Sequence, residues 1–193
     1  YLSPEARKGL FMSCRKAYFL SKFHLQQFIN SYGDYFHNAE IIPDPIDSNV
    51  FFDKGTERED KILYVGFMHP LKGTNLLFSE AIENPDKNFV VAGWSDMPTL
   101  LQNCDRIPNI EFLGKVDFEE MPNLYNKYKT MFYKPTFYEP YCRSVAEAIL
   151  CGMEVDSNGL IGCLHHLSEV GKDEMVLQCS KAPESFWESV ECL

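Results

Sequence analysis

The sequence predicts an α/β fold with a doubly wound, Rossmann-like parallel sheet. Short runs of β-branched and aromatic residues recur from residue 61 onward, and a segment with helical spacing of apolar residues follows each run. Glycine ends several of these runs, as is typical where a strand passes into a loop. The 193 residues are enough for one such domain with a buried core and part of another.

Four clear strands are expected in this region. They cover residues 62–65, 89–93, 110–114 and 130–133. Each is followed by an expected helix: around 76–82, over 97–103, around 121–128, and over 145–149. A weaker strand and helix are expected over 153–170, and Phe186 and Trp187 fall in an expected terminal helix. This alternation is typical of a parallel sheet covered by helices.

The first 60 residues follow a different pattern. They contain a strand-like run at 17–20, a helical segment at 22–31 and another strand-like run at 40–42. Pro43 and Pro45 then fall within three residues, before a charged stretch from Lys54 to Asp60, and indicate a connection between domains. We therefore expect a first domain end and linker at 1–60 and a sheet domain at 61–193. Because the chain starts at Tyr1, we also expect it to be part of a longer product.

Composition and charge exclude several classes of function. The chain has 18 Lys and Arg against 28 Asp and Glu, a net charge of −10, which disfavours nucleic-acid binding. Its 7 cysteines are scattered without a Cys-x-x-Cys pair, so we expect reduced thiols and no metal site. No apolar run reaches the roughly 18 residues of a membrane span, so we expect a cytoplasmic protein.

The first 35 residues form a local basic region. It has five cations against two acids. We expect a solvated helix face here, with peripheral contact to a membrane surface or an anionic substrate as the alternative.

Two glutamates stand out after the fourth expected strand. Glu139 falls in the loop that leaves the strand, and Glu147 falls eight positions later on the following helix. Ligands of open parallel sheets bind at the carboxyl ends of strands, and the amides that open a helix there bind anions. A carboxylate on either side of a bound diphosphate can accept hydrogen bonds from sugar hydroxyls. The alternatives are a helix-capping role for Glu139 and an ordinary surface position for Glu147.

A lysine follows the first expected strand of the sheet domain. Gly66 ends that strand, and Lys72 and Gly73 open the next helix at the same sheet edge. Lys72 can neutralise a diphosphate there, and the alternative is a solvated loop lysine.

Together these segments resemble the C-terminal, donor-binding domain of a GT-B glycosyltransferase of family 4, the large retaining class. The likeness extends from about residue 40 to residue 155. Its hallmarks are Glu-x7-Glu, here Glu139 and Glu147, and Lys-Gly in the first βα loop, here Lys72 and Gly73. Three further segments match the family in order and spacing: Ile41–Asp47, Val91–Gly93 and Phe112–Val116.

The resemblance implies a role for individual residues. Glu147 would hold the ribose hydroxyls of a nucleoside-diphosphate sugar, Glu139 would contact the transferred sugar as the catalytic-site residue, and Lys72 would bind the diphosphate. The segment around Val116 would meet the nucleobase through its backbone. Gly66, Cys142 and Arg143 complete the implied donor-binding set. The sugar would be transferred with retained configuration, without a metal or cofactor, because positive groups and helix amides stabilise the leaving diphosphate.

The sequence departs from the family pattern in two places near the site, and beyond Gly152 the likeness is faint. Phe67 follows Gly66 where the family usually has an arginine, and Pro140-Tyr141-Cys142-Arg143 replaces the usual Pro-Phe-Gly-Leu. We hypothesise that Arg143 supplies the missing diphosphate charge, with an outward arginine as the alternative.

Some other residues have simpler interpretations. His165 and His166 are adjacent and cannot share one helix face toward a metal, so both are expected on a helix surface. Cys142 and Cys151 are expected to pack against the helix between them. Trp94 is expected to cover the core, with a stacking platform as the alternative.

The sequence therefore predicts a retaining glycosyltransferase that moves a sugar from a nucleoside-diphosphate sugar to a glycan, lipid or small-molecule acceptor. This chain would supply mainly the donor site, the rest of the N-terminal domain would be missing, and the fragment alone would transfer poorly. The first alternative is a non-catalytic nucleotide-sugar-binding or interaction module derived from such a domain. The second is another α/β protein of this architecture, such as an epimerase.

Overall fold

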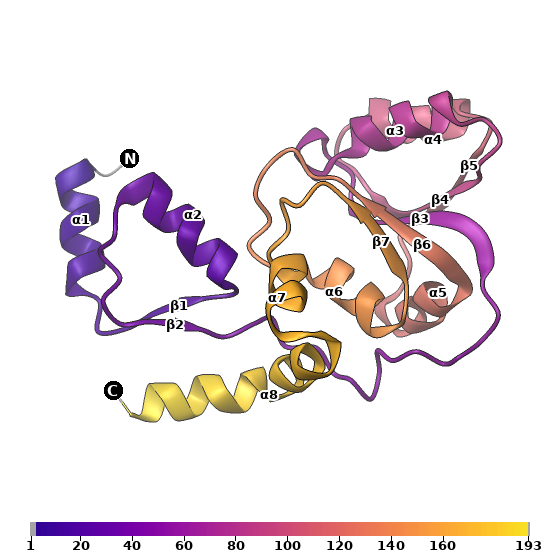
Figure 1. Cartoon of the computed structure of the whole chain (residues 1–193). Helices are drawn as coiled ribbons and strands as arrows, with labels where there is room; N and C mark the ends of the chain where they lie inside the picture. The colour runs from indigo at the N-terminus through magenta and orange to yellow at the C-terminus, as the bar shows by residue number, and fades with distance from the viewer. Residues whose placement is uncertain (1–2, 193) are drawn as a thin grey trace. The chain divides into compact units, whose positions relative to one another are not determined.

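Five parallel strands form the main sheet, in the order β5-β4-β3-β6-β7 (Figure 1). The structure is a computed structural model that describes residues 3–192. The strands are β3 (Glu59–Phe67), β4 (Phe89–Trp94), β5 (Ile110–Gly114), β6 (Tyr128–Tyr133) and β7 (Glu154–Ser157). The four clear strands and the weaker fifth that the sequence predicts are confirmed.

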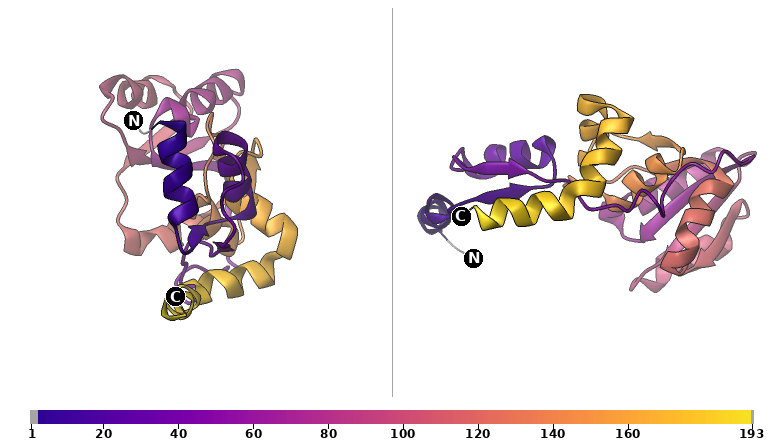
Figure 2. Two further views of the ribbon diagram at one scale, coloured as in Figure 1. Left: turned by 90° about the vertical axis from the view of Figure 1, so that its left-hand side faces the viewer. Right: turned by 90° about the horizontal axis from the view of Figure 1, so that it is seen from below.

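Helices cover both faces of this sheet, which confirms the doubly wound α/β fold. Figures 1 and 2 show α3 (Thr74–Glu83) and α4 (Pro98–Arg106) on one face, and α5 (Met121–Lys127) and α6 (Arg143–Leu150) on the other. Two 3₁₀ helices lie in the connections, η1 (Pro70–Lys72) and η2 (Phe118–Glu120).

The core of the sheet lies in its central strands. Leu63, Val90 and Met131, on β3, β4 and β6, are fully buried. These strands read as continuous apolar runs because helices cover both of their faces. Tyr64 and Tyr133 stack across β3 and β6, with ring centroids 5.9 Å apart.

The chain divides into two compact units. The sheet unit contains residues 48–137 and 143–160, and the terminal unit contains the residues up to Asp47, Tyr138–Cys142, and the residues from Ile161 onward. These units divide the chain differently from the expected domains, 1–60 and 61–193, which stay a prediction about a whole enzyme. Part of the expected linker already belongs to the sheet unit. There the Arg58 guanidinium donates to the carbonyl oxygens of Tyr125 and Cys151, and β3 begins at Glu59.

The terminal unit is built on a small sheet. Its strands β1 (Ala17–Phe19) and β2 (Ala39–Ile41) are parallel. Its helices are α1 (Pro4–Ser13), α2 (Lys22–Tyr32), α7 (Gly162–Val170) and α8 (Lys172–Glu191). The sequence did not predict α1, which begins with Ser3 as its cap and Pro4 in its first turn. Among residues 3–192, no helix is both long and apolar enough to cross a membrane.

Candidate functional site

The carboxyl edge of the main sheet holds most of the predicted site residues. Strand order reverses between β3 and β6, because β3 connects to β4 on one side and β6 connects to β7 on the other. In doubly wound sheets, ligands bind at such a switch point. Lys72 follows β3, and Arg143 and Glu147 lie on the helix that follows β6. The fold therefore brings these three residues to the two sides of one switch point.

The backbone fixes the loop that carries Lys72. Nδ1 of His69 accepts a hydrogen bond from the backbone N–H of Leu71, at 3.2 Å, and so caps η1. Gly73 ends η1 with a φ of 82°, and a Cβ there would lie 2.0 Å from the carbonyl oxygen of Lys134. Only glycine allows this approach of the two loops. The backbone N–H of Thr136 then donates to the carbonyl of Leu71, at 2.9 Å.

Glu147 is a buried carboxylate. Its side chain is 7% exposed, and its Oε2 accepts a hydrogen bond from the Tyr125 hydroxyl at 3.1 Å. Its Oε1 lies 3.2 Å from Nε of Arg143, one helical turn earlier. A buried carboxylate is costly unless hydrogen bonds and opposite charge compensate it, and both are present here. The surface alternative for Glu147 is therefore wrong.

Arg143 opens α6 with an ion pair. Its side chain is 58% exposed, so the guanidinium is at the surface while Nε faces Glu147. This places a cation in the first turn of the helix where the hypothesis needs one. Its role toward a diphosphate stays a prediction.

Gly66 lies near the end of β3, and Val116 lies in the connection after β5. Gly66 has a φ of 142°, and a Cβ on its partner Gly93 would lie 2.0 Å from the Gly66 carbonyl oxygen. Gly66 and Gly93 therefore allow the ends of β3 and β4 to approach closely. Val116 is half-buried in the connection after β5, beyond Gly114.

Glu139 and Cys142 belong to the terminal unit. Glu139 is half-buried and forms a single parallel bridge with Ile161, and its carbonyl accepts from the backbone N–H of Gly162 at 2.9 Å. Cys142 has a φ of 72°, the only positive value among the described residues other than glycine. The thiol of Cys163 donates to the Cys142 carbonyl at 3.7 Å. The segment that carries both residues is thus hydrogen-bonded to the start of α7.

A buried hydrogen-bond network next to these residues was missed by the sequence analysis. His166 is buried, so its expected surface position is wrong, whereas His165 is exposed and stacks on Phe23 at 4.3 Å. Nε2 of His166 lies 2.8 Å from Oε1 of Gln178, and because that oxygen only accepts, Nε2 carries the proton. Nδ1 therefore accepts from the Tyr141 hydroxyl, at 2.9 Å.

The same network brings the Tyr141 hydroxyl close to a buried thiol. The Tyr141 hydroxyl lies 3.0 Å from the sulfur of Cys179. Burial raises the pKa of the Tyr141 hydroxyl and the pKa of the Cys163 thiol, so both stay protonated at neutral pH. No signal in the sequence pointed to this site. Two adjacent histidines look alike in a sequence, although only His166 faces the interior of the unit.

The remaining cysteine and tryptophan expectations differ in outcome. Cys151 is fully buried after α6, which confirms its packing role. Trp94 is 52% exposed at the end of β4, so its expected role as a cover of the core is wrong.

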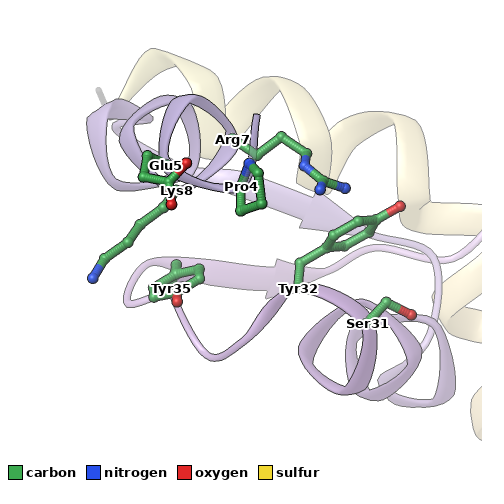
Figure 3. A pocket seen from close by; sticks show the side chains of 7 residues that line it. All are labelled: Pro4, Glu5, Arg7, Lys8, Ser31, Tyr32 and Tyr35. Atoms are coloured by element: carbon green, nitrogen blue, oxygen red, sulfur yellow. The ribbon is translucent and has the colours of Figure 1, made fainter. Parts of the chain in front are cut away.

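The terminal unit also contains a pocket of about 440 Å³ between α1 and α2 (Figure 3). Two of its cations lie over aromatic rings: the Arg7 guanidinium is 5.3 Å from the Tyr32 ring centroid, and Nζ of Lys8 is 5.3 Å from that of Tyr35. Two other cations of the basic region form ion pairs, Lys16 with Glu40 and Lys22 with Glu169. These contacts account for four of the five cations. Membrane contact by this region stays a prediction.

Comparisons with known proteins agree with this description. A family model described as "Glycosyl transferases group 1" matches residues 47–166, more than half of the chain. A human relative, one of the subunits of phosphatidylinositol N-acetylglucosaminyltransferase, is 24% identical over 166 residues. That match covers 79% of this chain and 33% of the human protein, so the chain spans about a third of this relative's length.

Solved structures show the same fold. HepE of Anabaena, crystallised in complex with UDP and glucose, has a TM-score of 0.71 at 16% identity, over 100% of this chain and 68% of that chain. The sucrose-phosphate synthase of Thermosynechococcus elongatus has a TM-score of 0.68 at 15% identity, over 97% of this chain and 58% of that chain. Both are GT-B proteins, and at this level of identity they show the fold alone.

Proposed function

Since the chain belongs to the group 1 glycosyl transferases, we propose that it provides the donor site of a retaining, family 4 glycosyltransferase, and that it binds a nucleoside-diphosphate sugar. The observation that carries this proposal is the burial of Glu147 at the switch point, with Tyr125 and Arg143 as partners. A carboxylate buried at this position is ready to accept hydrogen bonds from a diol.

The proposal assigns each residue a step in binding. Glu147 accepts hydrogen bonds from the ribose hydroxyls, and Tyr125 fixes the orientation of its carboxylate. Lys72, after β3, neutralises the diphosphate together with the amides that open α6. The chain beyond Gly114, at Val116, contacts the nucleobase through its backbone. Glu139 keeps the role toward the transferred sugar that the family pattern implies.

Charge stabilisation is the chemistry that these residues supply. As the bond between the sugar and the diphosphate breaks, negative charge develops on the leaving group, and fixed cations and helix amides lower the energy of that state. Arg143 adds a second cation if it turns from Glu147 toward the phosphates when ribose hydroxyls occupy the carboxylate. On this proposal an Arg143→Ala variant binds nucleoside diphosphates more weakly than the wild type.

Binding of nucleotides tests the proposal directly. Calorimetry with UDP, GDP and ADP is expected to show binding of at least one. The matching thermal shift reflects a stabilisation of about 2.7 kcal/mol when the ligand is at a hundredfold excess over its Kd. Absence of binding by all three and by their sugar conjugates would contradict the proposal.

The role of Glu147 is tested with the ribose itself. Glu147→Gln removes the charge but keeps the size, and hydrogen bonds to a charged group contribute about 1.5–3 kcal/mol, so roughly 10- to 100-fold weaker binding is expected. The wild type should prefer the ribonucleotide over its 2′-deoxy form, and the variant should lose this preference. Glu83→Gln, at an exposed position of α3, is the matched control and should bind like the wild type. An unchanged preference in Glu147→Gln would exclude the ribose role.

A second candidate function is a non-catalytic nucleotide-sugar-binding module. The phenylalanine at position 67, where the family has an arginine, favours it. Transfer requires the donor and acceptor to be held together, an effect worth about 7–11 kcal/mol, so we expect little transfer by this chain alone. Robust turnover with a defined acceptor would overturn that expectation and exclude the non-catalytic module.

A further inference from the structure

An aromatic pair lies on the carboxyl edge of the sheet beside the predicted donor-binding residues. Phe67 and Trp94 end β3 and β4, and their ring centroids are 4.7 Å apart. Phe67 also stacks on the ring of His69, with the two ring centroids 6.0 Å apart and an interplanar angle of 16°. Trp94 is the exposed member of this group, at 52%, whereas Phe67 and His69 are half-buried.

The backbone around this pair is held in place. The N–H of Met68 donates to the carbonyl of Trp94 at 2.8 Å, and the hydroxyl of Ser95 donates to the carbonyl of Met68 at 2.7 Å. The same hydroxyl accepts from the N–H of Met97 at 3.0 Å. The two loops after β3 and β4 are thus tied together, so the backbone that carries the indole is ordered before a ligand binds.

Strand alternation places the pair on the face of the sheet that carries α5 and α6. Phe67 and Trp94 are partners in the parallel register, so their side chains leave the same face. Tyr64, three residues before Phe67, points to the opposite face, where its hydroxyl lies 3.5 Å from that of Thr74 at the start of α3. The alternation therefore assigns the aromatic pair to the sheet face that α6 covers, and α6 carries Glu147.

The strand order gives the pair its neighbours along the edge. β4 lies between β5, which leads to Val116, and β3, which leads to Lys72. A nucleotide with its diphosphate at Lys72 and its base toward Val116 must cross the end of β4. The residue exposed at that end is Trp94.

We propose that Trp94, supported by Phe67, is a stacking platform for the nucleobase of a bound nucleoside diphosphate. The inference rests on the proposed function, and it names a recognition element that adds to the diphosphate and ribose contacts. The chain thereby replaces a cation at position 67 with an aromatic contact that every base can use, since each base has a π-face. Such a platform strengthens nucleotide binding while it discriminates little between bases.

Calorimetry on the full chain tests the platform, with UDP, a UDP-sugar and inorganic pyrophosphate as the three probes. Stacking of a base on an aromatic ring contributes about 1–3 kcal/mol, so Trp94→Ala should bind UDP about 5- to 100-fold more weakly. Its affinity for pyrophosphate should not change, because pyrophosphate has no ring. Trp94→Phe should recover part of the loss, and Phe52→Ala, at another exposed aromatic position of the sheet unit, should bind like the wild type.

Fluorescence gives an independent measurement. The chain has 2 tryptophans, so Trp187→Phe leaves Trp94 as the only one, and excitation at the long-wavelength edge of the indole band avoids the 10 tyrosines. UDP should quench this emission by stacking, whereas pyrophosphate should not. Circular dichroism of each variant shows that the fold is kept.

The outcomes separate the platform from the proposed function. If the wild type binds UDP and Trp94→Ala binds it equally well, the platform is wrong and the donor site stands. If Trp94→Ala weakens only the UDP-sugar, the indole faces the sugar and base stacking is wrong. If the wild type binds no nucleotide, both are wrong. Lys72→Ala serves as the reference, since it should weaken UDP and pyrophosphate alike.

Discussion

The two compact units of this chain are stabilised in different ways. The sheet unit surrounds β3, β4 and β6 with helices, and its central side chains, such as Leu63 and Val90, have no exposure. In the terminal unit, each strand has three residues, and within the described chain neither α1 nor α2 has a fully buried residue. The sheet unit thus buries its core between two covered faces. In the terminal unit, fully buried side chains such as Cys163 and Met175 lie on α7 and α8, whereas the small sheet with α1 and α2 depends more on aromatic contacts.

Aromatic rings supply much of the packing in the terminal unit. Phe19 makes edge contacts with Phe28 and Phe36, at 5.3 and 5.1 Å, and Phe11 lies 5.0 Å from Phe36. The buried Tyr141–His166 pair adds hydrogen bonds that no solvent molecule needs to satisfy. Each of these contacts joins only two or three residues. When one contact is lost, no large surrounding core can repack to compensate for it.

Removal of a core leucine is expected to have the largest effect. Leu77 is fully buried in α3, so Leu77→Ala should lower the free energy of unfolding of the sheet unit by about 2–5 kcal/mol. Leu10 is 51% exposed in α1, and Leu10→Ala should change the stability of the terminal unit by no more than about 0.5 kcal/mol. A comparable loss in both variants would contradict the described burial of Leu77 in the sheet unit and exposure of Leu10 in the terminal unit.

The chain offers a separate optical probe for each unit in this experiment. Trp94 belongs to the sheet unit and Trp187 to the terminal unit. Urea unfolding in a Trp187→Phe background follows the sheet unit, and unfolding in a Trp94→Phe background follows the terminal unit. Separate transitions would also show whether the units unfold independently.

The adjacent histidines of α7 give the next largest expected effect. His166→Ala removes the nitrogen acceptor of the buried Tyr141 hydroxyl, which then keeps only its contact with the sulfur of Cys179. The loss of a buried hydrogen-bond partner costs about 1–3 kcal/mol. His165→Ala removes an exposed ring that stacks on Phe23, so its cost should be several-fold smaller. Unfolding followed by Trp187 measures both. Equal costs would mean that the network contributes no more than a surface stack.

The sequence predicted the sheet unit much better than the terminal unit. Val90, Val91 and their neighbours are apolar on both sides of their strand, and a run of this kind is recognisable without knowledge of its partners. Lys72 and Glu147 were found because their spacing from strand ends reflects the fold itself. The burial of Glu147 was not predictable, because it depends on the Tyr125 hydroxyl, 22 positions away.

The failures have more than one physical cause. α1 has weak amphipathic character and contains Gly9, so periodicity gave no signal for it. The burial of His166 depends on Tyr141 and Gln178, which come from separate segments of the chain. The exposure of Trp94 follows from its position at the end of β4, beyond the part of the strand that helices cover. The burial of His166 and the exposure of Trp94 are thus decided by how distant parts of the chain pack. A local sequence pattern contains no information about such contacts.

Alkaline pH should weaken the sheet unit through its buried thiols. Burial raises the pKa of Cys104 to about 11 from a reference value of 9.0. Between these values the unfolded chain releases the proton and the folded chain keeps it, so stability is complete below pH 9 and falls as the pH rises toward 11. One thiol contributes a slope of at most about 1.4 kcal/mol per pH unit. In Cys104→Ala, unfolding measured from pH 8 to pH 11 should have a smaller slope, and an unchanged slope would contradict this assignment.

The smallest expected effect is a gain of stability at Cys142. Its φ of 72° is left-handed, a conformation that costs a residue with a Cβ about 1–2 kcal/mol, and the family pattern has glycine at this position. Cys142→Gly removes the strain, but glycine also makes the unfolded chain more flexible, so the net gain in the terminal unit should be roughly 0.5–1 kcal/mol. Cys142→Ala is the matched control, because it removes the thiol and keeps the Cβ. If alanine stabilises as much as glycine, the relief comes from the sulfur, and the backbone at this position is not strained.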